Sequence, residues 1–130
     1  MEQKLATEVH QTAVSKGWWD EFEMAVTCEK PYIEVPKDLF IRMFLICKLT
    51  LISTEVSEAI EELRENKINW FSRGDKLKPE GLLSEIADID IRLYDFIEVI
   101  KNNFSADYKN ILDIKAEFNK ERPYKHGKIL

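Results

Sequence analysis

Apolar residues recur at every third or fourth position along two long stretches of the chain, residues 36–66 and 79–103. This spacing places them on one side of an amphipathic α-helix. Glycine and proline, with four of each in 130 residues, are too scarce for an architecture with many turns. The sequence therefore predicts an all-α protein.

The residue pattern predicts four helices and one further helical turn, over residues 2–16, 36–66, 79–103, 106–121 and, for the turn, 20–28. Gly17 and Pro123 would end the first and the last helix. Residues 67–78 are expected to connect two helices, and residues 123–130 to form an extended tail. We expect a single domain over residues 1–130, folded as a four-to-five-helix bundle.

The charge and cysteine content exclude several classes of protein. A formal net charge of −5 argues against nucleic acid as a partner, because a basic face would be needed. Cys28 and Cys47 are too few for a disulfide framework or a zinc site, and Cys47, in an apolar run, is expected to be buried. Residues 1–4 do not begin a signal peptide, and residues 39–52 are too short to span a bilayer. We expect a cytoplasmic protein without a membrane partner.

Two pairs of carboxylates lie on consecutive predicted helices, Glu55 with Glu58 and Glu85 with Asp88. Their i, i+3 spacing puts both members of a pair on one side of the helix, beside the apolar stripe. Only Asp88 has a basic residue four positions later, Arg92, so most of this charge is not neutralised locally. If the helices pack antiparallel, the pairs can converge and bind a hard divalent ion such as Mg²⁺ or Mn²⁺. The alternative is that each pair is part of a solvated helix face.

The two acidic motifs and the C-terminal run Asn119-Lys-Glu-Arg-Pro-Tyr-Lys-His-Gly-Lys128 together resemble the MazG-like all-α nucleoside triphosphate pyrophosphohydrolases. Lys78-Pro-Glu-Gly81, and His10 followed by Gly17-Trp-Trp19, are also similar to sequences of that family. The resemblance implies a bundle of the MazG type. It also implies Mg²⁺-dependent hydrolysis of a nucleoside triphosphate, a deoxynucleotide being favoured, in a bacterial or phage-infected cell. The products would be the monophosphate and pyrophosphate; base and sugar stay open.

The resemblance also implies the metal ligands, which would be Glu55, Glu58, Glu85 and Asp88. Metal ions would offset charge at the α-phosphorus and lower the pKa of the attacking water. Glu58 or Glu55 would accept the proton of that water. Asp95 is expected to be either an extra ligand or a hydrogen-bond partner of the ligands. Glu62 lies on the same flank of its helix as Glu55 and Glu58, and we expect it beside the ligands.

Contacts to the substrate are expected from the last helix and the tail. Lys115, Asn119 and Arg122 fall at i, i+4 and i+7, on one face of a helix, and can reach a common triphosphate. Lys125 and His126 follow in the tail and can close over it. The alternative for these residues is a solvated basic helix end, which the helix dipole favours.

Aromatic residues are candidates for stacking on the base, with Trp19 foremost. The other candidates are Trp18, Trp70 and Phe71. The alternative for each is packing in the core or at a subunit interface. His10 is expected either to contact the nucleotide or to be structural.

Two further interpretations compete with the hydrolase. A di-iron bundle needs Glu-x-x-His pairs, and neither histidine follows a glutamate at that distance. A non-catalytic helical interaction module would use its acidic edges to bind a basic partner. The third helix has a second apolar side, with Leu83, Ile91 and Tyr94, so we also expect a homodimer or a dimer of dimers.

Overall fold

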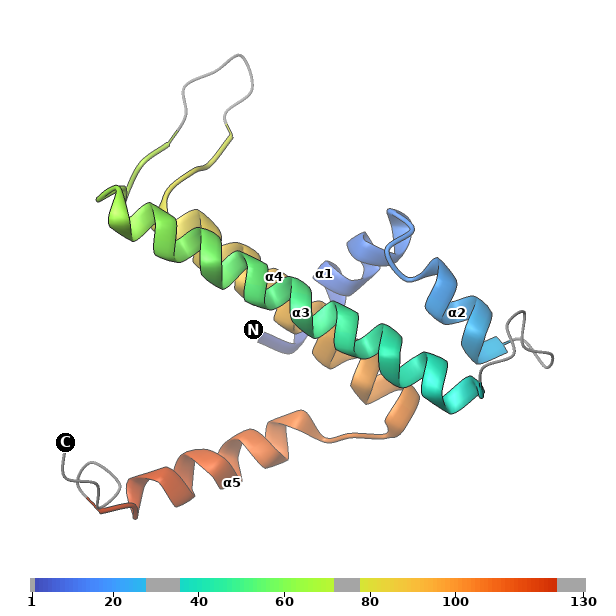
Figure 1. Ribbon diagram of the computed structural model, residues 1–130. Helices are drawn as coiled ribbons and strands as arrows, with labels where there is room; N and C mark the ends of the chain where they lie inside the picture. Colours follow the sequence, from blue (N-terminus) through green and yellow to red (C-terminus); the bar gives the residue numbers. More distant parts are fainter. Residues whose placement is uncertain (1, 28–35, 72–77, 124–130) are drawn as a thin grey trace. The chain divides into compact units, whose positions relative to one another are not determined.

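A computed structural model of the chain describes residues 2–27, 36–71 and 78–123, and this part of the chain is helical (Figure 1). Its five helices are α1 (Glu2–Ser15), α2 (Asp20–Thr27), α3 (Lys37–Arg64), α4 (Leu82–Phe104) and α5 (Tyr108–Lys120). Within these ranges, the one pairing of strand type is an isolated antiparallel bridge between Phe71 and Pro79. The prediction of an all-α protein is confirmed. Cys28, Lys125, His126 and the rest of the predicted tail beyond Pro123 lie outside the described residues.

The chain divides into two compact units, residues 1–98 and 99–130. The first unit holds α1, α2, α3 and α4 as far as Glu98. The second holds the end of α4 and all of α5. The expectation of a single domain over the whole chain stays a prediction.

The helix ends follow local signals in the sequence. Gly17 has a φ of +79°, in the left-handed region that glycine adopts without strain, and α1 ends just before it. The carboxylate of Asp107 accepts a hydrogen bond of 3.0 Å from the backbone N–H of Asn110 and caps α5. The predicted turn within residues 20–28 is a full helix, α2, with Asp20, Glu21 and Glu23 in its first turn.

Gly81, just before α4, packs closely against Lys67, which lies just after α3. Its φ is +97°, and a Cβ built on it would lie 2.8 Å from the carbonyl oxygen of Lys67. That carbonyl also accepts a hydrogen bond of 2.9 Å from the backbone N–H of Leu82. Only glycine allows this close approach, so Gly81 holds the two ends of the connection together.

An aromatic cluster forms the centre of the first unit. Trp19 and Phe22 are the most buried large side chains, each 1% exposed. Their rings meet edge to face at 5.6 Å, and both contact the ring of Phe44 on α3. The loop after α1, helix α2 and helix α3 are thus joined by aromatic packing.

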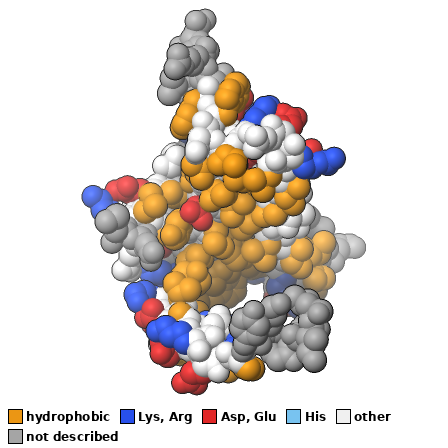
Figure 2. Space-filling model, turned by 90° about the vertical axis from the view of Figure 1, so that its left-hand side faces the viewer, with side chains coloured by type: hydrophobic (Ala, Val, Ile, Leu, Met, Phe, Trp, Pro, Cys, Tyr) orange, Lys and Arg blue, Asp and Glu red, His pale blue; other side chains and the backbone are white. Residues whose placement is uncertain are grey.

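Many apolar side chains of α3 are exposed among the described residues. Figure 2 shows hydrophobic side chains gathered at the molecular surface. Ala59 is buried, as its place in the apolar stripe predicts, but Ile60 and Leu63 of the same stripe are each 51% exposed. The expectation of a buried Cys47 is wrong, because its side chain is exposed. The hydrophobic pattern predicted the helix correctly but not which of its sides the chain itself covers. None of the described helices is both long and apolar enough to cross a bilayer.

Candidate metal centre and adjoining cavity

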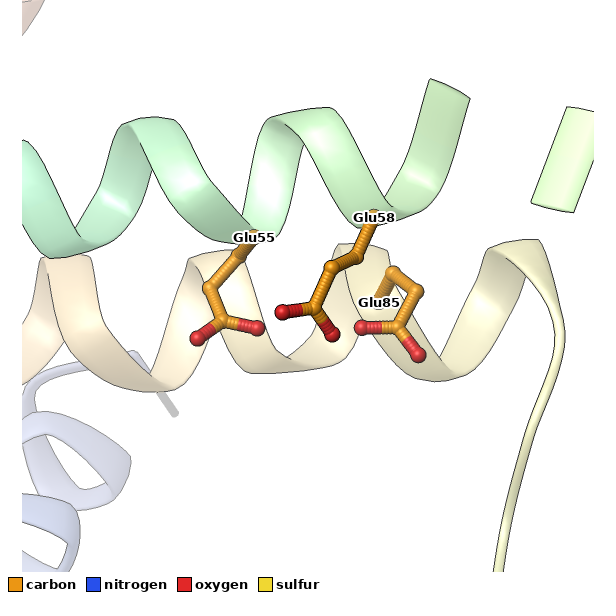
Figure 3. A group of neighbouring side chains, drawn as sticks. All are labelled: Glu55, Glu58 and Glu85. Carbon is orange, nitrogen blue, oxygen red and sulfur yellow. The ribbon is translucent and has the colours of Figure 1, made fainter. Parts of the chain in front are cut away.

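Helices α3 and α4 lie side by side and run antiparallel, which brings their acidic motifs together (Figure 1). Each of Glu55, Glu58 and Glu85 offers a carboxylate oxygen, and these oxygens lie within 4.8 Å of one another. Figure 3 shows Glu55 and Glu58 reaching from α3, and Glu85 from α4, into the same space. The convergence expected from the two i, i+3 motifs is therefore present for these three residues.

The three carboxylates differ in exposure. Glu55 is buried, with 6% of its surface exposed, whereas Glu85 is half-buried and Glu58 is exposed. Burial raises the pKa of Glu85 above its ordinary value, and the negative charges of Glu58, Asp88, Glu55 and Glu62 raise it further. The carboxylates of this group repel one another, and a bound cation would reduce that repulsion.

Asp88 is not one of the three residues whose oxygens converge. It is exposed on α4, one turn beyond Glu85, and its charge acts on Glu85. Its role as a fourth ligand stays a prediction.

Glu62 lies one turn beyond Glu58 on α3, and its charge also acts on Glu85. Its Oε2 is buried and has no hydrogen-bond partner among the described residues. A buried carboxylate oxygen without a partner is energetically costly. A cation near Glu85 would therefore stabilise Glu62 as well.

Arg92 provides a counter-charge that its position in the sequence did not indicate. Its Nε and Nη2 each lie 2.6 Å from Oε1 of Glu55, across the contact between α4 and α3. The spacing along α4 had suggested Asp88 as its neighbour, four positions earlier. The buried Glu55 is thus paired in this structure, and Glu58 and Glu85 have no ion pair among the described contacts.

The donor set fits a hard divalent cation. The converging atoms are all carboxylate oxygens, the ligands that Mg²⁺ and Mn²⁺ prefer, and one carboxylate can move on the exposed side of the group. The group can hold a metal ion, and Glu55, Glu58 and Glu85 would be its ligands.

A cavity of about 500 Å³ opens beside these carboxylates, within the first unit. Its apolar wall comes from Leu5, Val9, Ala13, Leu51, Ile91 and Phe96. Its charged wall comes from Glu8, Lys16, Lys48, Asp88, Arg92 and Asp95. The volume is in the range of small-molecule sites, and the mixture of apolar and charged walls suits a ligand with both characters. Asp88 and Arg92 link this cavity to the acidic group.

Asp95 lines the cavity and accepts hydrogen bonds from two other segments of the chain. The indole N–H of Trp19 donates to both of its oxygens at 2.8 Å, and Nδ1 of His10 lies 2.6 Å from Oδ1. A carboxylate accepts hydrogen bonds, so this contact fits the His10 tautomer that has a proton on Nδ1. Asp95 joins α4 to α1 and to the loop before α2, and His10 has the structural contact that was one of its two expected roles.

Lys48 is a cavity residue that the sequence did not single out. Its Nζ lies 4.6 Å from the centre of the Trp19 ring and 5.5 Å from that of Trp18, and it donates to the carbonyl oxygen of Trp18. Burial lowers the pKa of Lys48, although Asp95 and Glu21 act in the opposite direction. A lysine interrupting an apolar helical run was the available signal.

The aromatic candidates are placed differently from one another. Trp19 is almost fully buried in the aromatic cluster, although part of it lines the cavity. Trp18 lines the cavity and is 55% exposed, which leaves it open to a ligand. Trp70 and Phe71 are exposed after α3 and are not among the cavity residues.

The predicted phosphate contacts lie in the second unit. Lys115 on α5 and Arg122 just beyond its end both approach the ring of Phe118, at 5.5 Å and 5.7 Å from its centre. Asn119 is exposed on α5. A common helix face for Lys115, Asn119 and Arg122 was expected, but Arg122 lies beyond the end of α5 at Lys120. The role of these residues in binding a substrate stays a prediction.

In comparisons with known proteins, the chain matches no protein-family model, no curated protein and no solved structure.

Proposed function

We propose that this protein is a MazG-like nucleoside triphosphate pyrophosphohydrolase that uses Mg²⁺ or Mn²⁺. The observation that carries the proposal is the convergence of the oxygens of Glu55, Glu58 and Glu85 within 4.8 Å beside a cavity of about 500 Å³. A nucleoside triphosphate has both parts that this arrangement suits, a phosphate chain that binds divalent ions and a largely uncharged nucleoside.

The carboxylates would hold the metal, with Asp88 as an additional ligand on the exposed side. A divalent ion bound there would offset charge at the α-phosphorus and lower the pKa of the attacking water. Glu58 is the preferred general base, because it is exposed and unpaired among the described contacts, whereas Glu55 is held by Arg92.

The cavity would take the nucleoside. Trp18 offers an exposed aromatic face for stacking, and Asp95, His10 and Lys48 are polar groups at or near the cavity wall. Lys115, Asn119, Arg122, Lys125 and His126 remain candidate phosphate contacts, as the resemblance implies. A deoxynucleotide is the favoured substrate, and the base is not specified.

The exposed side of α3 supports self-association. Its exposed apolar residues are Leu39, Met43, Ile46, Leu49, Val56, Ile60 and Leu63, which are mostly spaced by three or four. We propose that a second copy of the chain covers this stripe, giving a homodimer or a dimer of dimers.

Hydrolysis in H₂¹⁸O tests the proposed reaction at the level of the bond that breaks. Attack at the α-phosphorus places the label in the nucleoside monophosphate and leaves pyrophosphate unlabelled. Label in pyrophosphate, or release of inorganic phosphate, would mean a different reaction. A non-catalytic interaction module would release no labelled product and would bind a basic partner equally well in EDTA.

A further inference from the structure

Arg92 lies where the acidic group and the cavity meet. Its guanidinium contacts Oε1 of Glu55 through both Nε and Nη2, each at 2.6 Å. The same side chain lines the cavity and is 35% exposed, whereas the Glu55 side chain is 8% exposed. A partly exposed cation therefore holds the oxygen of a buried acid.

This ion pair differs from those of the two arginines on α3, Arg42 and Arg64. Arg42 pairs with Asp38, and Arg64 with Glu61, within exposed turns of the same helix. Such surface pairs contribute little to stability. Arg92 instead crosses from α4 to α3 and neutralises a carboxylate that would otherwise be buried without a counter-charge, which is costly.

A divalent cation bound by Glu55, Glu58 and Glu85 would supply the same counter-charge from the other side. We infer that Arg92 is the counter-ion of Glu55 in the metal-free protein and competes with the metal for Oε1. Cation binding releases the guanidinium to the cavity, where its planar set of donors suits a phosphate group. This inference rests on the proposed metal site and adds a residue that exchanges partners when the site fills.

Metal binding by variants of Arg92 tests the exchange without relying on activity. Mn²⁺ is titrated into the full chain, and free Mn²⁺ is followed by electron paramagnetic resonance. We expect Arg92→Gln to bind Mn²⁺ roughly tenfold more tightly than the wild type, an effect of the size that groups beside metal ligands commonly have. Arg92→Lys keeps the charge and is expected to fall between the two, and Arg64→Gln, the matched control, to bind as the wild type does.

The opposite result has a clear meaning. If Arg92 only orients Glu55 for the metal, its removal would weaken Mn²⁺ binding, by about 10- to 100-fold. Weaker or unchanged binding by Arg92→Gln, with binding by the wild type, would overturn the exchange alone. No Mn²⁺ binding by the wild type at millimolar concentration would overturn the proposed metal site and the exchange together.

Two measurements cover the case in which Arg92→Gln is unstable. Its melting temperature should rise more with Mn²⁺ than that of the wild type, because the ion replaces the lost counter-charge. In wild-type protein labelled with ¹⁵N, the Nε–H resonance of Arg92 should shift during a Mg²⁺ titration, with the midpoint of metal binding. An unchanged resonance at saturating Mg²⁺ would overturn the exchange.

Discussion

The indole N–H of Trp19 donates a hydrogen bond to both carboxylate oxygens of Asp95, each at 2.8 Å. Trp19 precedes α2 and Asp95 lies on α4, so this contact positions one wall of the cavity relative to another. His10 reaches the same carboxylate from α1. A single aspartate on α4 therefore joins that helix to α1 and to the loop before α2.

Asp95→Asn is expected to destabilise the protein by about 1–3 kcal/mol, because an NH₂ group, which is a donor, replaces one of the two oxygens that accept from the indole N–H of Trp19. Urea unfolding followed by circular dichroism measures the change. Asp90→Asn, an exposed position on the same helix, is the control and should unfold as the wild type does. Equal stability of Asp95→Asn and the control would mean that the three-way contact adds nothing.

Glu58→Gln should lose turnover and keep the fold. As the proposed general base and ligand, its loss is expected to lower kcat by roughly 10²- to 10⁴-fold. Its melting temperature should be unchanged or slightly higher, because one of several mutually repelling charges is removed from an exposed site. Asp88→Asn is expected to lose turnover in the same way.

Glu61→Gln is the matched control for these variants, since Glu61 is exposed on α3 and pairs with Arg64. It should retain wild-type activity. Near wild-type activity in Glu58→Gln would show that the site is assigned to the wrong residues.

The lowered pKa of Lys48 predicts that the stability of the protein depends on pH. Burial lowers its pKa below the ordinary value of 10.5, so between its folded pKa and 10.5 the unfolded chain binds more protons than the native one. The free energy of unfolding contributed by this residue therefore rises as pH rises through that window. We expect the stability of the wild type relative to Lys48→Met to increase with pH there, measured by urea unfolding at several pH values. A difference that stays flat or falls would contradict the burial of this ammonium group.

Self-association is expected through the exposed stripe of α3. Light scattering coupled to size exclusion should give two or four times the 15.3 kDa mass of the chain at micromolar concentration. Ile46→Glu, at a side chain that is 60% exposed, should shift the mass toward the monomer. Gln11→Glu, exposed on α1, should not. A monomeric wild type at this concentration would contradict the proposed self-association.

The acidic group was predictable because it depends on local geometry. An i, i+3 pair lies on one side of its helix, so antiparallel packing of the two helices was the one further condition for the pairs to meet. The pairing of Arg92 with Glu55 was not predictable, because it depends on the register of α4 against α3. That register is a tertiary feature, which the spacing of residues along either helix does not contain.

The sequence also did not predict which side of α3 is covered by other parts of the chain. Periodicity identifies an apolar stripe, but Ala59 and Ile60 belong to the same stripe and one is buried while the other is exposed. Trp19 was expected as a stacking residue, and its hydrogen bonds to Asp95 depend on the loop after Gly17 folding back onto α4.

Pyrophosphate release from a panel of canonical and modified ribo- and deoxynucleoside triphosphates, with Mg²⁺, Mn²⁺ or EDTA, tests the central proposal most directly. We predict release from one or a few nucleotides that requires a divalent ion and stops in EDTA. No release from any nucleotide, or equal release in EDTA, would contradict a metal-dependent pyrophosphohydrolase.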